Sequence, residues 1–254
     1  MHKIIALDLD ETLLDSRKTL SEYTLEVLNK CKANGYILAI SSTRGYGACK
    51  DIAEKINADY ICCQSGNMIV DAFGSIIYKH GFANEELEQF LNLAKKYTKN
   101  IIIDSNTNLY GGINDDFCKK WKVIYKDTED LIDLDAYKIC VYYENGYQKI
   151  LEDYCKEHNY VCRVMRTDPY LFITPADSDK FYALEKLIEI LKTDLDHLFV
   201  FGDDNSDLLS IQKAKYGVAV ANARPEVLDG AKYVTKSNDE DGVACFLESN
   251  LLVQ

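Results

Sequence analysis

The chain has 254 residues, 47% of them hydrophobic and 28% charged, with only 3 prolines. This composition is typical of a folded globular protein and excludes a disordered or fibrous one. Acidic residues outnumber Lys and Arg by 41 to 29, and the net charge of −12 disfavours nucleic acid and anionic membranes as partners, because both require cationic surfaces.

The first third of the chain has the pattern of a parallel sheet with covering helices. Residues 3–9 form an apolar run that predicts a strand buried on both faces. Ser21 is expected to cap a helix that ends before Gly35. The following elements are a strand at 36–40, a helix at 46–56, a strand at 60–63 and a hairpin at 68–78 that turns at Phe73-Gly74.

The middle of the chain has a different, antiparallel pattern. The predicted elements are a helix at 84–97, a strand at 101–104, a loop around Gly111-Gly112, a strand at 136–143, a helix at 146–157, and strands at 161–166 and 170–174. The alternation of helices and strands that is typical of a parallel sheet then returns, with a helix at 180–191, a strand at 198–201, a helix at 208–213 and a strand at 217–220. We therefore expect an α/β core of residues 1–82 and 177–254, with an α+β unit of residues 83–176 inserted in it.

The cysteines and the apolar runs indicate a cytoplasmic protein. The 9 cysteines are odd in number and include no C-x-x-C pair, which favours reduced thiols over disulfides or a zinc site. The apolar run near the N-terminus is too short for a signal peptide, and no stretch approaches the roughly 18 apolar residues of a membrane span. We expect a monomer or homodimer.

Two carboxylates follow the first predicted strand. Asp8 and Asp10 share a face of an extended backbone, and two charges about 4 Å apart repel by roughly 4 kcal/mol at an effective dielectric of 20. A Mg²⁺ ion would compensate, since it takes carboxylate ligands together with substrate phosphate. The alternative interpretation is a solvated acidic loop.

A second acidic group, Asp203 with Asp207, follows the strand at 198–201. Open parallel sheets bind ligands at the carboxyl ends of their strands, so both side chains are expected to face the same crevice as Asp8. The alternative is a cluster that only caps the next helix.

A hydroxyl and a lysine complete the set. Ser42 follows the second predicted strand, where it is able to bind phosphate or merely cap a helix. Lys180 opens a helix, against the helix dipole, which indicates an acidic cluster or a phosphate beside it unless the lysine is simply solvated. Carboxylates, a hydroxyl and a lysine at one sheet edge are the groups that phosphoryl transfer needs.

The motifs in their order resemble the haloacid dehalogenase (HAD) superfamily, and within it the Cof-type phosphatases with an inserted type IIB cap. The resemblance spans almost the whole chain through D-x-D-x-T at Asp8, Asp10 and Thr12, Ser42 with Arg44 in place of T-G-R, Lys180, and G-D-x-x-x-D at Gly202, Asp203 and Asp207. It implies a three-layer Rossmann-like core with an α+β cap domain, and a Mg²⁺-dependent phosphatase acting on small phosphorylated metabolites, such as sugar phosphates, through an aspartyl-phosphate.

The resemblance also implies residue roles. Asp8 would attack phosphorus, and Asp10 would protonate the leaving oxygen and then activate water, with its pKa raised by neighbouring negative charge. The metal would be held by the Asp8 side chain, the Asp10 backbone carbonyl and Asp203, with Asp207 in or beside the ligand set. Ser42 and Lys180 would bind the transferring phosphoryl group.

The chain departs from the family pattern at Glu11 and Thr43, which replace glycines, and at Ser65 and Ser206, which replace asparagines. Spacing alone leaves open whether Asp203 or Asp204 ligates the metal. The alternatives kept open are a phosphomutase, a receiver of a signalling phosphoryl group, and a phosphate-binding protein with impaired catalysis.

Overall fold

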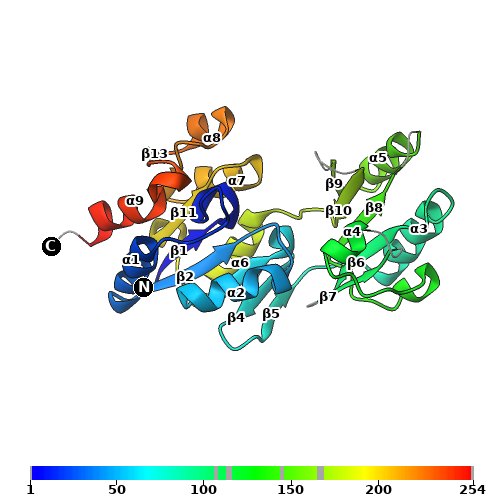
Figure 1. The fold of residues 1–254 in the computed structure, drawn as a ribbon, viewed down its shortest axis with the longest axis horizontal. Helices are drawn as coiled ribbons and strands as arrows, with labels where there is room; N and C mark the ends of the chain where they lie inside the picture. Colours follow the sequence, from blue (N-terminus) through cyan, green and yellow to red (C-terminus); the bar gives the residue numbers. More distant parts are fainter. Residues whose placement is uncertain (1, 106–107, 113–115, 144–145, 165–168, 253–254) are drawn as a thin grey trace. The chain divides into compact units, whose positions relative to one another are not determined.

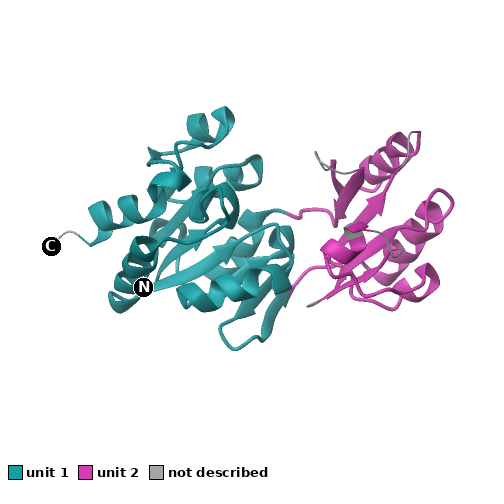
Figure 2. Ribbon diagram, viewed as in Figure 1, with its two compact units in different colours: residues 1–78, 179–254 teal, residues 79–178 magenta. Residues whose placement is uncertain are grey.

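The computed structural model describes residues 2–105, 108–112, 116–143, 146–164 and 169–252. The chain divides into two compact units, residues 1–78 with 179–254 and residues 79–178 (Figure 2). The expected crossings at 82/83 and 176/177 both fall inside the inserted unit so defined. Their assignment as borders of a catalytic core and a cap stays a prediction.

The first unit contains an eight-stranded sheet in the order β13-β12-β11-β1-β2-β3-β4-β5 (Figure 1). Neighbours from β13 to β3 are parallel, and β4 returns antiparallel to β3. The strands are β1 Lys3–Leu7, β2 Tyr36–Ser41, β3 Tyr60–Cys63, β4 Met68–Asp71, β5 Ile76–Lys79, β11 Leu198–Gly202, β12 Tyr216–Ala219 and β13 Tyr233–Val234.

Helices cover this sheet in two groups. In the first group, α1 packs against α2 and α9. In the second group, α7 packs against α6 and α8. Right-handed crossovers that run in opposite directions from β1 place the two groups on opposite faces. The predicted three-layer parallel core is confirmed. The helices are α1 Glu22–Ala33, α2 Tyr46–Ile56, α6 Lys180–Leu191, α7 Asn205–Lys213, α8 Pro225–Gly230 and α9 Gly242–Leu251.

Local sequence signals account for several of these boundaries. Ser21 caps α1 by accepting a hydrogen bond from the Thr24 N–H at 2.9 Å. Gly35 follows this helix with φ +80°, a left-handed conformation that glycine adopts without steric cost. Helix α7 begins at Asn205, earlier than predicted, because the Asp204 side chain caps it. The expected ends of α2 and α6 are confirmed.

The second unit contains a five-stranded antiparallel sheet in the order β7-β6-β8-β10-β9. Its strands are β6 Ile101–Ser105, β7 Asn108–Gly111, β8 Lys138–Tyr142, β9 Val161–Val164 and β10 Tyr170–Thr174. Strand β7 was predicted as a loop because glycines interrupt the pattern there. The predicted strand at 161–166 extends into residues outside those described.

Alternating residues of this second sheet build one hydrophobic core with the helices α3 Asn84–Ala94 and α5 Gln148–Glu157. Ile103, Ile139 and Ile173, from three adjacent strands, pack with Phe90 of α3 and Leu151 of α5. The short elements α4 Asp116–Lys120 and η3 Thr128–Leu131 complete the unit. Its α+β character is thus as predicted.

The entry and exit of the inserted unit lie side by side. A ring nitrogen of His80 lies 3.0 Å from the Ala176 carbonyl oxygen, within hydrogen-bond distance. The chain therefore leaves the first unit and returns to it at one place.

Two further observations concern the cysteines and the helices. All 9 cysteines are free thiols, and 7 of them are buried. Among the described residues, no helix combines the length and the apolar character needed to cross a bilayer.

Candidate active site

The first candidate residues follow β1 and β11, which are parallel neighbours. Leu7 pairs with Phe201 in the register, and the Asp8 N–H donates to the Phe201 carbonyl at 3.1 Å. Asp8 and Asp203 therefore lie at the same carboxyl edge, where the strand order reverses between β1 and β11. Such reversal points are where open parallel sheets bind ligands.

The Lys180 cluster, which we define as Asp8, Lys180, Asp203 and Asp207, gathers at this edge. Lys180 Nζ donates to Asp8 Oδ1 at 2.6 Å and to Asp207 Oδ1 at 2.8 Å. Lys180 is only 3% exposed and Asp8 only 5%. The interpretations of Lys180 as a solvated lysine and of Asp8 as part of a solvated loop are therefore wrong.

Asp207 supports the cluster from the first turn of α7. Its Oδ2 faces the N–H groups of Asp203 and Asp204 at 3.4 and 3.3 Å, while Oδ1 accepts from Lys180. Gly202 permits this approach, since a Cβ there would lie 2.4 Å from the Asp207 side chain. Asp207 thus caps the helix and also holds Lys180, so the interpretation of this motif as a cluster that only caps the helix is wrong, while its part in a metal site stays a prediction.

Asp203, and not Asp204, joins the acidic group. Oxygens of Asp8, Asp203 and Asp207 lie within 4.8 Å of one another. Thr12 orients Asp203 by donating from Oγ1 to Oδ1 at 2.9 Å. Asp204 instead caps α7 and pairs with Arg224 at 2.5 Å. The role of Thr12 was missed, although it stands in the D-x-D-x-T motif.

Burial controls the protonation equilibria of the cluster. Burial raises the pKa of Asp8 even though the charge of Lys180 opposes the shift. Burial also raises the pKa of Asp203 to about 6, with the Thr12 hydrogen bond acting against it and the Asp207 charge adding to it. The pKa of Lys180 lies above its usual value, because the two carboxylates outweigh its own desolvation. Three carboxylates thus share one ammonium.

This donor set fits a divalent cation. The acidic group offers hard oxygen ligands, as Mg²⁺ requires, and carries more negative charge than Lys180 neutralises. A cation there would lower the cost of keeping Asp8 and Asp203 ionised.

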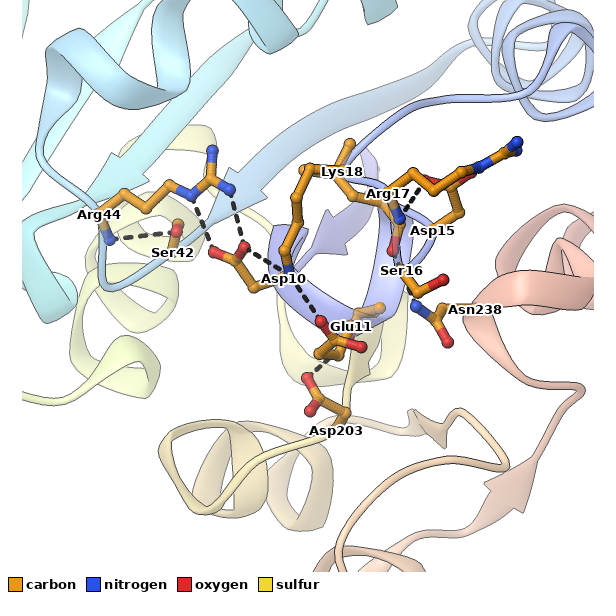
Figure 3. A network of polar contacts seen from close by, with 12 residues as sticks. Asp10, Glu11, Asp15, Ser16, Arg17, Lys18, Ser42, Arg44, Asp203 and Asn238 are labelled. Atoms are coloured by element: carbon orange, nitrogen blue, oxygen red, sulfur yellow. Dashed lines mark hydrogen bonds and ion pairs between the residues drawn. The ribbon is translucent and has the colours of Figure 1, made fainter. Parts of the chain in front are cut away.

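Asp10 points to a different set of partners. Arg44 donates to it from Nε at 2.8 Å and from a terminal nitrogen at 2.7 Å, and Lys18 Nζ lies 3.3 Å from its Oδ1 (Figure 3). Among the described residues, the carboxylate of Asp10 is not part of the acidic group that Asp8 forms. A role of the Asp10 backbone carbonyl as a metal ligand remains a prediction.

The expected direction of the Asp10 pKa shift is wrong. Partial burial does act to raise this pKa, but the hydrogen bonds and charge of Arg44, helped by Lys18, prevail and lower it. The prediction of a raised pKa rested on the neighbouring acids, whereas the two cations decide the direction of the shift. Lys18 lies in a loop without a motif, so its positive charge was the only feature of the sequence that indicated a possible partner for Asp10.

Ser42 lies at the carboxyl end of β2 and is 1% exposed. Its N–H donates to the Cys62 carbonyl at 2.8 Å, and its Oγ accepts from the Arg44 N–H at 3.2 Å. The N-cap of α2 is Gly45, so the interpretation of Ser42 as a helix cap is wrong.

Gly66, in the short helix η2 Gln64–Gly66, fixes the start of α6. Its φ is +94°, and a Cβ there would lie 2.0 Å from the carbonyl oxygen of Asp179. Because Asp179 immediately precedes Lys180, a side chain at Gly66 would push the lysine out of place. Glycine at position 66 thus has a structural reason in this chain.

Comparison with known proteins shows the family of the chain. A family profile described as haloacid dehalogenase-like hydrolase matches residues 5–247. The chain is 25% identical to the 5-amino-6-(5-phospho-D-ribitylamino)uracil phosphatase YcsE of Bacillus subtilis, over 95% of this chain and 93% of the relative. It is 24% identical to a phosphoglycolate phosphatase of Methanobrevibacter smithii, over 98% of both chains.

Solved structures share the fold over nearly the whole chain. A haloacid dehalogenase-like hydrolase from Bacteroides thetaiotaomicron superposes with a TM-score of 0.86 at 26% identity, covering 98% of this chain and 99% of that one. The subclass IIB sugar phosphatase BT4131 superposes with a TM-score of 0.82 at 18% identity, covering 99% and 100%. The fold predicted from the sequence, including the inserted unit, is confirmed.

Proposed function

The chain belongs to the haloacid dehalogenase-like hydrolases, and we propose that it is a Mg²⁺-dependent phosphatase acting on small phosphorylated metabolites, such as sugar phosphates. The single observation that carries the proposal is the buried Lys180, whose ammonium bridges Asp8 and Asp207. A nucleophile beside a fixed cation suits the attack on a negatively charged phosphoryl group. Two relatives named as phosphatases of small metabolites support the same class.

Asp8 is the proposed nucleophile. Its carboxylate oxygen forms a bond to phosphorus while the bond from phosphorus to the leaving oxygen breaks, which gives an aspartyl-phosphate and an alcohol. Water then attacks the phosphorus, and the Asp8 carboxylate departs as inorganic phosphate is released. Lys180 and Ser42, which both lie near this sheet edge, would bind the transferring oxygens throughout.

Asp10 is the proposed acid and base. It gives a proton to the leaving oxygen in the first step and takes one from water in the second. Because Arg44 and Lys18 hold its carboxylate as an anion, Asp10 must take up a proton and exchange one of these contacts for the leaving oxygen before it acts.

Asp8, Asp203 and the Asp10 carbonyl would hold the Mg²⁺, with Asp207 supporting them. When bound, the ion neutralises charge on the phosphoryl oxygens and on the clustered carboxylates. Thr12 keeps Asp203 oriented for this task. We further propose a cytoplasmic monomer or homodimer that has neither a nucleic acid nor a membrane as partner.

A substrate panel tests the proposal. The purified protein should release phosphate from one or more sugar phosphates or other small phosphate monoesters only when Mg²⁺ is present, and Asp8→Asn should abolish the release. Asp51→Asn, at an exposed site on α2, is the matched control and should keep wild-type turnover. Absence of metal-dependent release from every compound would overturn the proposal, and transfer to a second substrate hydroxyl in preference to water would indicate a phosphomutase.

A further inference from the structure

Two residues beside Asp10 have left-handed backbone conformations that are unusual for residues with a Cβ. Glu11 has φ +57° and Lys18 has φ +62°. Glu11 replaces the glycine that the family pattern has, so this chain accepts a strain which glycine would avoid. Strained residues at a site call for a compensating contact.

That contact is the ion pair between the two strained residues. Lys18 Nζ lies 2.5 Å from Glu11 Oε1, and the same nitrogen lies 3.3 Å from Asp10 Oδ1 (Figure 3). Arg44 donates two hydrogen bonds to the Asp10 carboxylate from its other side. The Asp10 carboxylate is therefore held between two cations, one of which Glu11 holds in turn.

Hydrogen bonds fix the backbone of the loop that carries Lys18. Asp15 Oδ1 accepts from the N–H groups of Arg17 and Thr19 at 3.0 and 2.7 Å. The Lys18 N–H donates to the Asp15 carbonyl at 2.8 Å, and the Asp15 N–H donates to the Thr19 carbonyl at 3.0 Å. The Ser16 N–H donates to Asp239 at 2.8 Å, which ties the loop to the rest of the unit. The backbone of Lys18 is thus fixed although its side chain is 46% exposed.

We propose that Lys18 is a positioning residue for Asp10 and that Glu11 holds Lys18 in place for this task. The inference rests on the proposed function, because it assigns Lys18 an effect on the proton transfer made by Asp10. Among the described salt bridges, Lys18 Nζ pairs with Asp10 and Glu11 and not with the proposed nucleophile Asp8. When Asp10 exchanges its Arg44 contacts for the leaving oxygen, the remaining Lys18 contact limits the number of orientations that the carboxylate samples, which favours the productive one.

Leaving-group dependence separates this role from a merely structural one. A sugar alkoxide needs a proton from Asp10 in order to leave, whereas p-nitrophenolate leaves without one. Lys18→Met should therefore lower kcat about tenfold for a sugar phosphate and much less for p-nitrophenyl phosphate, with little change in KM. Lys18→Arg, which keeps the cation, should restore most of the loss.

Arg17→Met is the matched control, because Arg17 lies in the same loop, is 83% exposed and pairs only with Asp15 among the described salt bridges. It removes the same charge and should leave both rates within about twofold of wild type. The proposal is wrong if Lys18→Met behaves like Arg17→Met, if it slows both substrates equally, or if it accelerates turnover.

Thermal unfolding tests the Glu11–Lys18 pair independently of activity. Lys18→Met should lower Tm by about 1–3 °C in the wild-type chain and by clearly less in the Glu11→Gln background, where the short contact is already gone. Equal decreases in the two backgrounds would overturn the pairing. The Tm decreases could prove non-additive in a protein that shows no phosphatase turnover. That result would retain the Glu11–Lys18 pair but would refute the proposed function, and with it the positioning role of Lys18.

Discussion

Lys180 Nζ and Asp207 Oδ1 lie 2.8 Å apart and join the first residue of α6 to the first turn of α7. Both side chains are almost completely buried. Since the same ammonium also binds Asp8 at the end of β1, three elements that are distant in the sequence meet in one charged contact. The site is therefore held together by the groups that are proposed to perform its chemistry.

Removal of this ammonium should cost both stability and activity. Lys180→Met leaves two buried carboxylates without their cation, and breaking a buried ion pair typically costs about 3–5 kcal/mol of unfolding free energy. We also expect kcat/KM to fall at least about a hundredfold, because an oriented charge on the phosphoryl group is lost. Urea unfolding and steady-state kinetics measure the two effects.

Lys186→Met is the control for this prediction. Lys186 lies on the same helix but is 43% exposed and pairs only with nearby Glu189 among the described salt bridges. Its removal should change stability by less than about 1 kcal/mol. Similar losses in the two variants would refute the special role of Lys180.

Gly66→Ala should destabilise the protein more than Gly35→Ala. Both glycines have positive φ values, so alanine at either site incurs a backbone cost of about 1–2 kcal/mol. At Gly35 nothing lies within 4 Å of the added Cβ, whereas at Gly66 the carbonyl of Asp179 lies 2.0 Å away. Overpacking should add about 1–3 kcal/mol at Gly66, and turnover should fall as Lys180 shifts. Equal unfolding free energies for the two variants would contradict the close approach.

The raised pKa of Asp203 predicts a pH dependence of stability in metal-free protein. Asp203 titrates near 3.8 in the unfolded chain and at about 6 in the folded one, so between these values the folded state binds more protons. Its contribution to stability therefore declines as pH rises from about 4 to about 6 and is constant above that range. Asp203→Asn lacks this titration. In EDTA, the Tm of Asp203→Asn minus the Tm of the wild type should therefore increase from about pH 4 to about pH 6. A Tm difference that does not change with pH would exclude the raised pKa of Asp203.

Mg²⁺ should stabilise the folded protein measurably. A ligand that binds only the folded state adds about 2.7 kcal/mol at a hundred times its Kd. Differential scanning calorimetry should thus show Tm rising with Mg²⁺ concentration in the wild type and much less in Asp203→Asn. A shift of the same size in both proteins would place the ion elsewhere.

The sequence predicted most elements of the first unit as far as β12, because their signals are local, whereas α8, β13 and α9 were not predicted. Helix α2 and helix α6 begin and end where periodicity and caps indicate. Strand β7 was missed because Gly111, at its end, is typical of a loop when the pairing of this segment with β6 is unknown. Pairing partners lie far apart in sequence, and a single strand's pattern does not reveal them.

The site was predicted to the level of residue types and not of contacts. The strand ends indicated that Asp8 and Asp203 converge, since parallel strands share one carboxyl edge, and the position of Lys180 at a helix start indicated an acidic partner. The two partners of Asp10 could not be predicted from strand ends. Lys18 and Arg44 reach it through side chains whose direction depends on loop conformation, including the left-handed Lys18.

The contact of His80 with Ala176 brings the two ends of the inserted segment together. Every residue of the Lys180 cluster, together with Asp10, Thr12, Ser42 and Arg44, belongs to the other unit. Evolution is therefore free to lengthen, trim or exchange the stretch between these two ends while the reactive groups keep their own scaffold. In such a protein the chemistry is inherited while the insert diversifies.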